Sequence, residues 1–402
     1  MKNLYPFLLA LLFATQAFGQ RYLTEVFPNV NVSSDLVYGS APAWTSFNVD
    51  LKLDIYQPAG DVLSQRPLMV LAHGGSFVAG SKTEAYMVEL CQTFAKRGYV
   101  TVSIGYRLGI NFANVSGVSD ELVKANLRAV QDFNAAIRYF YKSARHEGNP
   151  YGVDTNRIIA GGYSAGSLAA IHSQLFYDLN SAPQNVRQFT NQLGGLQGGN
   201  NGSAGFPSRA IGLWNMAGAI LDTQMVNNPN VATISFHSND DDVVPYGDGF
   251  VYFSGTPIVE MHGSSIIHNR LNTLGAIQQF NGFTGLFHNL FATQASTDTV
   301  ISKTTRFFYH YVVNNPAVSV NETAENSLLI YPNPVSHNRL YINGLNQGSL
   351  SIQNAFGQTI WQLERGLNGK TVIETESFPK GMYLVHHQNE RQTLGVYKIW
   401  IH

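Results

Sequence analysis

A serine flanked by glycines is the pattern in this chain that points most directly to chemistry. Gly162-Tyr-Ser-Ala-Gly166 fits the motif G-x-S-x-G, the residues 158–161 before it read as a short buried strand, and Ser167 to Ile171 read as a helix. A strand that turns sharply into a helix exposes the residue at the corner, and glycines two positions away remove side chains that would clash there. The pattern predicts that Ser164 is a nucleophile at a helix N-terminus, where backbone N–H groups favour negative charge.

A nucleophilic serine needs a base, and the base needs an acid that orients it. In the arrangement that is typical of the G-x-S-x-G motif, the acid follows the nucleophile in the chain and the histidine comes last. A predicted strand ends at His237, and three acidic residues follow it, namely Asp240, Asp241 and Asp242. We favour Asp241, because in the related pattern H-G-x-x-D-x-x-V-P the acid stands four residues after the histidine and four before the proline, here Pro245. The other two aspartates are expected in a solvated turn or, alternatively, in a calcium-like cluster.

The base is expected in a late loop. His288 follows a glycine and precedes the start of a predicted helix, which is the expected order and context. His268 is the rival, but it lies within what reads as a helix and suits a wall of the substrate site or the surface better.

A tetrahedral intermediate needs N–H donors directed at its oxygen. One donor is expected from Ala165, the residue after the serine. The others are expected from the loop His73-Gly-Gly-Ser-Phe77, where glycines let backbone amides point inward, so we assign Gly75 and Ser76 as donors and His73 as a brace for the loop.

Composition limits the classes of partner. The 402-residue chain has 13% charged residues and a formal net charge of −1, which gives no electrostatic case for binding nucleic acid. Its one cysteine, Cys91, excludes a disulfide within the chain and reads as a small buried hydrophobic residue. Histidines and cysteines show no metal-ligand spacing, so we expect neither a metal nor another cofactor.

The N-terminus has the features of a secretory signal peptide. Lys2 precedes an apolar run and the small residues Ala17 and Gly19, so we expect residues 1–19 to be removed on export. No later stretch has the roughly 18 unbroken apolar residues of a transmembrane segment.

The rest of the chain divides into two regions with different patterns of predicted secondary structure. From residue 20 to residue 313, apolar strands alternate with amphipathic helices, which predicts a mostly parallel sheet flanked by helices. Within this part, the Gly/Asn-rich stretch 192–205 reads as a mobile loop close to the serine. Residues 314–326 read as a linker. Short β-like runs at close spacing then fill residues 327–402 and predict a small all-β sandwich.

Residues of about 35–312 resemble the carboxylesterase and lipase branch of the α/β-hydrolase family. The resemblance rests on His73-Gly-Gly-Ser-Phe77, Gly162-Tyr-Ser-Ala-Gly166, the Asp241 loop and His288. It implies an eight-stranded sheet and a triad of Ser164, His288 and Asp241. Ser76 departs from the family, which usually has a third glycine or an alanine there; the donor is a backbone N–H, so little changes.

Residues 327–402 resemble the C-terminal sorting domain of type IX secretion. Tyr331-Pro-Asn-Pro334, Asn354-Ala-Phe-Gly357, Lys380-Gly-Met-Tyr-Leu384 and the basic, β-rich end at Lys398 to Ile401 match its successive motifs. The resemblance implies that these residues engage the type IX secretion machinery of a gram-negative bacterium, and that the protein works outside the cell or on its surface.

Together these features favour a secreted serine esterase without cofactors, acting on an ester substrate through an acyl-enzyme intermediate. The candidate substrates include polysaccharide esters and polyesters such as poly(ethylene terephthalate). Trp214 and Tyr163 would suit aromatic acyl groups if they lie near the site, although aromatic residues of this kind more often belong to the core. The alternatives are a serine peptidase of the prolyl-oligopeptidase kind, for whose propeller there is no room, and a catalytically inactive binding module on the same fold.

Overall fold

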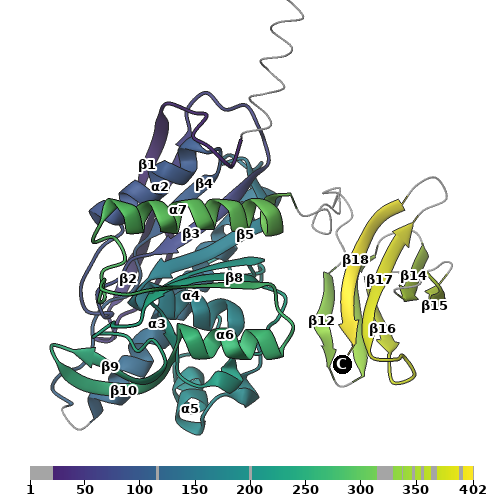
Figure 1. The fold of residues 1–402 in the computed structure, drawn as a ribbon. Helices are drawn as coiled ribbons and strands as arrows, with labels where there is room; N and C mark the ends of the chain where they lie inside the picture. Colours follow the sequence, from purple (N-terminus) through teal and green to yellow (C-terminus); the bar gives the residue numbers. More distant parts are fainter. Residues whose placement is uncertain are drawn as a thin grey trace, which may run out of the picture. The chain divides into compact units, whose positions relative to one another are not determined.

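The chain folds into two compact units in a computed structural model, Met1–Asn315 and Pro316–His402. The structure describes residues 21–114, 117–198, 202–314, 329–336, 338–345, 349–354, 357–363, 369–388 and 393–401 (Figure 1). The predicted signal peptide lies outside these residues, as does the predicted linker beyond Asn314. The cleavage site and the precise domain boundaries therefore stay predictions.

The first unit is built on an eight-stranded sheet in the order β1-β2-β4-β3-β5-β6-β8-β11. The strands β1 and β2 and the pair β2 and β4 are antiparallel, and all other neighbours are parallel, which confirms the predicted mostly parallel sheet. The central strands are apolar and buried on both faces because helices cover both sides. The bounds are β1 Val30–Pro42, β2 Asn48–Pro58, β3 Arg66–Ala72, β4 Val100–Ile104, β5 Val153–Tyr163, β6 Gly212–Met216, β8 Ala232–Ser238 and β11 Gln278–Phe283.

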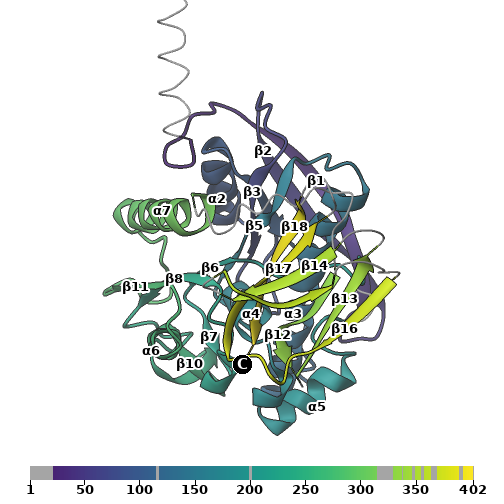
Figure 2. The ribbon, with the colours of Figure 1, turned by 90° about the vertical axis from the view of Figure 1, so that its right-hand side faces the viewer.

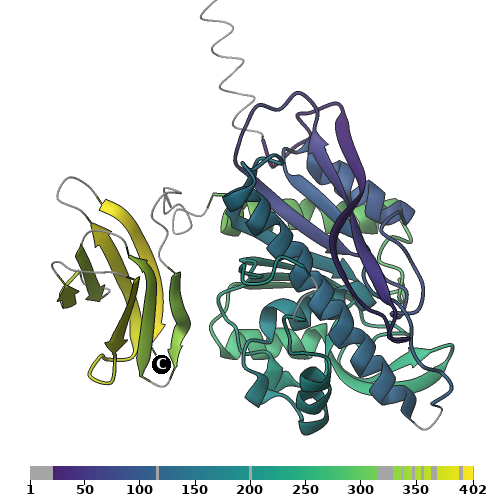
Figure 3. The same cartoon turned by 180° about the vertical axis from the view of Figure 1, so that it is seen from behind.

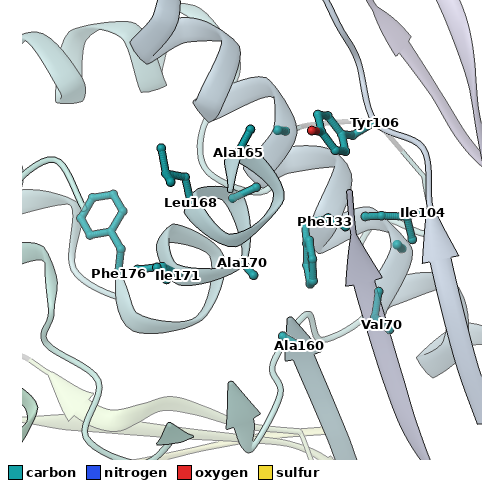
Figure 4. Packing of buried hydrophobic residues seen from close by; sticks show 14 of the residues in the cluster. Val70, Ile104, Tyr106, Phe133, Ala160, Ala165, Leu168, Ala170, Ile171 and Phe176 are labelled. Carbon is teal, nitrogen blue, oxygen red and sulfur yellow. The ribbon is translucent and has the colours of Figure 1, made fainter. Parts of the chain in front are cut away.

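Helices cover the two faces of this sheet unequally. The helices α2 (Ala85–Lys96) and α7 (Gln294–Phe308) pack on one face around Phe94, Trp214 and Phe308, and Figure 2 shows them on the same side. The long helix α3 (Val118–His146), which runs diagonally across the front of the view in Figure 3, packs on the opposite face with α4 (Ala165–Leu175), α5 (Gln184–Gln192) and α6 (Ser264–Thr273). Figure 4 shows the interior of this larger cluster, where Phe133 lies among small and aliphatic residues of α4 and the strands.

A second, small sheet stands apart from the central one. The hairpin of β9 (Asp248–Phe253) and β10 (Thr256–Gly263) pairs with the two-residue strand β7 (Ala219–Ile220). The sequence analysis did not predict this hairpin or the edge strand β1. Much of β1 is exposed and its register shifts twice, so it lacks the regular alternation by which a strand is read from sequence.

The Gly/Asn-rich stretch 192–205 is tied to α3 in its described part. Gln131 donates from its amide to the carbonyls of Leu193 and Gly195, at 2.8 and 2.7 Å, and Arg138 donates to the carbonyl of Gly202 at 3.0 Å. These contacts hold the stretch against the body of the unit rather than at Ser164.

The described residues of the second unit form seven strands, all of which the sequence predicts. Two antiparallel groups, β15-β14-β17-β18 and β12-β13-β16, are joined by one parallel pairing between Val335 and Ile401. Both groups contribute to one apolar core, with Ile342 and Ile352 fully buried. The bounds are β12 Leu329–Ser336, β13 Arg339–Leu345, β14 Ser349–Asn354, β15 Thr359–Leu363, β16 Gly369–Glu374, β17 Gly381–Gln388 and β18 Thr393–Ile401.

Candidate active site

Ser164 occupies a strained corner between β5 and α4. Its backbone has φ +54°, in the left-handed region that non-glycine residues rarely adopt, and it is the residue that immediately precedes α4. A Cβ on Gly162 would come within 2.4 Å of the backbone of Gly166, and one on Gly166 within 2.2 Å of the carbonyl of Ala72. Only glycine fits at both positions, which is the role that the G-x-S-x-G motif predicts for them.

The structure brings Ser164, His288 and Asp241 into one hydrogen-bonded line. The hydroxyl of Ser164 donates to Nε2 of His288 at 2.8 Å, and Nδ1 of His288 donates to Oδ2 of Asp241 at 2.7 Å. The side chain of Asp241 is fully buried, and that of His288 is 18% exposed. This geometry fixes the tautomer of the imidazole, because a carboxylate can only accept.

Asp241 accepts hydrogen bonds from more than one histidine. Nε2 of His237 lies 3.2 Å from the same Oδ2, and the backbone N–H groups of Val243 and Val244 donate to Oδ1 at 2.9 and 2.8 Å. Burial raises the pKa of Asp241, but the hydrogen bonds from His237 and His288 outweigh it and hold the pKa well below its usual value. Asp241 is therefore ionised at neutral pH, as an orienting group must be.

His237 belongs to a buried polar cluster behind the acid. Its Nε2 also contacts the carbonyl of Val244 at 3.1 Å, so this nitrogen carries the hydrogen, and its Nδ1 lies 2.8 Å from Oγ of Ser264. Asn215 donates to the same Oγ at 2.9 Å and accepts from Ser167, in the first turn of α4, at 2.7 Å. The sequence analysis used His237 only to locate the acid; its position four residues before Asp241 was the available signal for this contact.

The other two aspartates of the run have different surroundings. Asp240 accepts the backbone N–H groups of Gly285 and Phe287, at 2.8 and 3.2 Å, and so holds the loop that carries His288. The hydrogen bond from Ser238 is the main cause that lowers the pKa of Asp240. Asp242 is exposed. The expectation of a solvated turn thus describes Asp242 but misses the structural role of Asp240.

The rival histidine lies away from the serine. His268 is in α6, where Nε2 contacts Oγ of Ser235 at 2.6 Å and Nδ1 contacts Oε1 of Gln278 at 2.5 Å. Burial lowers the pKa of His268 to about 4.

Of the two aromatic residues for which the sequence left a place near the site or in the core, Tyr163 lies at the site and Trp214 lies in the core. The ring of Tyr163 stacks on His288, with ring centroids 5.4 Å apart, and its hydroxyl donates to the carbonyl of His288. Trp214 is fully buried against Phe94 on the α2 and α7 face of the sheet, 5.2 Å between ring centroids. Because side chains alternate along a strand, the neighbouring Asn215 points to the site instead.

The loop after β3 lies against the nucleophile. A Cβ on Gly74 would be 3.2 Å from that of Ser164, and Gly75 and Ser76 both have positive φ, at +115° and +54°. His73 is buried, its ring stacks on Tyr106, and the Tyr106 hydroxyl donates to its carbonyl at 2.8 Å. Ser76 and Ala165, two of the three predicted donors, line the same pocket as Ser164, and Gly75 directly precedes Ser76 in this loop.

Neither a metal nor a reactive thiol is indicated at this site. Within the described residues, no group of three or more His, Cys, Asp or Glu side chains is arranged to hold a metal ion. Cys91 is buried in α2, and burial raises the pKa of its thiol to about 12, which agrees with its predicted role as a small hydrophobic residue.

Two family models match the chain. Residues 53–195 match the BD-FAE family and residues 329–402 match the secretion system C-terminal sorting domain. The mouse protein Carboxylesterase 3B is 38% identical over 138 residues, which are 33% of this chain and 21% of that protein. The chain thus spans about a fifth of the length of this relative.

Solved esterase structures resemble the first unit. Esterase 2 of Thermogutta terrifontis with propionate bound is 21% identical, with a TM-score of 0.48. The match covers 72% of this chain and 97% of the esterase chain. Its apo form is 21% identical, with a TM-score of 0.46 and coverages of 70% and 95%.

The fold and the family matches define the chain as an esterase-like α/β-hydrolase domain joined to a secretion sorting domain. The sorting domain indicates export by type IX secretion to the cell surface or beyond it. None of the helices in the described part of the chain combines the length and the apolar composition that crossing a bilayer requires.

Proposed function

We propose that this protein is a secreted serine carboxylic-ester hydrolase that uses Ser164, His288 and Asp241 as a catalytic triad. The observation that carries the proposal is the pair of hydrogen bonds, 2.8 and 2.7 Å long, that runs from the Ser164 hydroxyl through His288 to the buried Asp241. The matches to the BD-FAE family and to a carboxylesterase support ester hydrolysis as the reaction.

In the first half of the reaction, Oγ of Ser164 attacks the ester carbonyl while Nε2 of His288 takes the hydroxyl proton. The imidazolium is stabilised by the ionised Asp241, which does not itself take the proton. The tetrahedral intermediate collapses when His288 returns the proton to the oxygen of the leaving alcohol, and the acyl group stays on Ser164.

In the second half, a water molecule attacks the acyl-enzyme and gives a proton to His288. The second tetrahedral intermediate expels Oγ of Ser164, which recovers that proton, and the carboxylic acid leaves. Backbone N–H groups of Gly75, Ser76 and Ala165 are the proposed donors to the oxyanion in both halves; removing one such donor typically costs about 10²–10³ in kcat.

Hydrolysis of p-nitrophenyl acetate tests the proposal. We expect Ser164→Ala to lose at least roughly 10⁴-fold in kcat, whereas Ser173→Ala in the same helix retains activity. His288→Gln and His268→Gln form a second matched pair, of which only the first is expected to be inactive. Wild-type activity in Ser164→Ala would exclude this nucleophile.

The natural ester is a further part of the proposal. Export suits a substrate outside the cell. Besides short-chain acyl esters and glycerides, the candidates include acyl groups on polysaccharide and synthetic polyester. Release of acetate from acetylated xylan and of soluble products from poly(ethylene terephthalate) film, each compared with Ser164→Ala, distinguishes them.

A further inference from the structure

A cluster of three aromatic rings joins the separate segments that form the proposed site. Tyr86 lies in the first turn of α2, Tyr163 precedes the nucleophile, and Phe291 lies three residues after His288. The ring of Tyr86 stacks on Phe291 with centroids 5.6 Å apart and packs edge-on against Tyr163 at 5.3 Å. Tyr163 and Phe291 pack edge-on as well, at 5.6 Å. Each ring thus contacts both of the others, so moving any one of the three segments disturbs the packing of the other two.

Two hydroxyl groups of this cluster bind the backbone of two different loops. The oxygen of Tyr86 accepts the N–H of Gly74 at 2.9 Å, and the hydroxyl of Tyr163 donates to the carbonyl of His288. Gly74 belongs to the loop with the proposed oxyanion donors, and His288 is the proposed base. The cluster therefore engages the backbone of both loops that must be placed correctly relative to Ser164.

The hydroxyl of Tyr86 contributes to the position of the oxyanion loop. This loop has no helix or strand of its own, so hydrogen bonds from other segments help to fix it. Tyr106 binds the loop at the carbonyl of His73, and Tyr86 binds it at the next N–H, that of Gly74. A Cβ on Gly74 would lie 3.3 Å from Cδ1 of Tyr163, so the loop packs directly against the nucleophile corner. The direction of the N–H groups that follow Gly74 thus depends on a bond made from outside the loop.

We propose that Tyr86 is a positioning residue for ester hydrolysis. Its hydroxyl fixes Gly74, the residue immediately before the proposed oxyanion donors Gly75 and Ser76, and its ring supports the His288 loop through Phe291. Tyr86 acts through these residues rather than on the ester itself. The proposal rests on the proposed esterase function and adds a residue of α2 to the groups on which the rate depends.

Tyr86→Phe removes the hydroxyl and keeps the ring. The N–H of Gly74 loses its acceptor, and the resulting shift of the loop is expected to lower kcat on p-nitrophenyl acetate about tenfold. KM should change by less than about twofold, because the carbonyl of the bound ester carries no charge for the displaced donors to stabilise. Tyr141→Phe is the matched control: Tyr141 of α3 also donates to a backbone group, the carbonyl of Arg209 at 3.2 Å, and its loss should leave kcat unchanged.

Inhibition by trifluoroacetone distinguishes positioning from a general loss of stability. Oγ of Ser164 adds to the carbonyl carbon of the ketone, the hydroxyl proton passes to His288, and the former carbonyl oxygen becomes an oxyanion facing the proposed donors. Because this adduct resembles the tetrahedral intermediate, its inhibition constant should rise about tenfold in Tyr86→Phe, by the same factor by which kcat/KM falls. In Tyr141→Phe it should keep the wild-type value. A lower melting temperature of Tyr86→Phe with an unchanged inhibition constant overturns the assignment.

Phe291→Leu is a second variant, which covers the case in which Tyr86→Phe does not fold. It keeps an apolar side chain but removes the ring on which Tyr86 stacks, so kcat should fall in the same direction. Wild-type kcat and inhibition constants in the folded variants, with hydrolysis still dependent on Ser164, overturn the role of Tyr86 alone. A wild-type protein that does not hydrolyse p-nitrophenyl acetate overturns the proposed function, and the role of Tyr86 with it.

Discussion

The corner that carries Ser164 and the loop that carries His288 are held in place in different ways. The corner is built from consecutive residues: a buried strand, two glycines that cannot be replaced without a backbone clash, and the first turn of α4. The His288 loop has no regular structure from residue 284 to residue 293, and Gly285 and Phe287 have positive φ. Its position depends on Asp240 and Asp241, which follow β8 more than 40 residues earlier.

The difference shows where the proposed site depends on local sequence and where on tertiary contacts. A nucleophile on a strand-to-helix corner is oriented by backbone geometry alone, while its base is oriented by two neighbouring carboxylates with separate tasks. Asp241 orients the imidazole ring of His288, and Asp240 orients the backbone of the loop that carries His288. Substitutions at Asp240 or Asp241 should therefore change the rate of ester hydrolysis without unfolding the corner that carries Ser164.

Asp241→Asn is expected to have the largest effect. The amide removes the negative charge that favours the imidazolium and presents a donor to Nδ1 of His288, so kcat should fall by roughly 10⁴ on p-nitrophenyl acetate. Asp242→Asn is the matched control, since Asp242 is exposed, and should behave as the wild type. If Asp242→Asn were the inactive variant instead, the choice of acid would be wrong.

Asp240→Ala should have a smaller effect on the same reaction. Loss of the acceptor for Gly285 and Phe287 frees the loop backbone, and a displacement of about 1 Å at a catalytic group can cost roughly 10²-fold in rate. We expect kcat to fall by about ten- to a hundredfold, with the melting temperature almost unchanged because the residue is near the surface. Wild-type kcat in this variant would show that the loop is held without Asp240.

The smallest expected effect is on the pH dependence of the free energy of unfolding. It involves His172 in α4, the helix that follows Ser164. His172 in α4 donates from Nδ1 to the carbonyl of Leu168 at 2.8 Å and accepts the N–H of Leu221 at Nε2 at 3.3 Å, so only the neutral ring fits. Burial lowers the pKa of His172 to about 4. The unfolded chain binds this proton near pH 6.5, so the stabilisation is complete above that value and is lost as the pH falls toward 4.

For His172 this loss amounts to at most about 3 kcal/mol in the free energy of unfolding. Urea denaturation at pH 7.5, 6 and 4.5 measures it. His172→Gln should reduce the decline, and His146→Gln, at an exposed position, should not. An equal decline in the wild type and in His172→Gln would contradict this assignment.

Local features of the sequence were sufficient for most of the fold. The apolar strands, the glycine-flanked serine and the seven short strands of the second unit each have a signature within a few residues. Strand β1 was missed because it is largely exposed and its register shifts twice. The hairpin was missed because β9 has one buried residue and β10 alternates only from Val259 to Gly263.

The residues of the proposed site could be predicted from the sequence, but several of the contacts between them could not. Ser164, Asp241 and His288 follow from order and spacing, yet the contact of His237 with Asp241 and the hold of Asp240 on the loop arise only when β8 and the late loop meet. The sequence left open whether Trp214 lies near the site or in the core; it lies in the core, because the register of β6 turns Asn215 rather than Trp214 toward Ser167.

Covalent labelling of the serine tests the central claim most directly. The full chain is incubated with an organophosphate that reacts only with activated serines, such as diethyl p-nitrophenyl phosphate, and the adduct is located by peptide mass spectrometry. We predict one diethylphosphoryl group on Ser164, formed at a rate that falls in step with kcat in Asp241→Asn and His288→Gln. An active protein that carries the adduct on another residue, or none, would contradict the proposed mechanism.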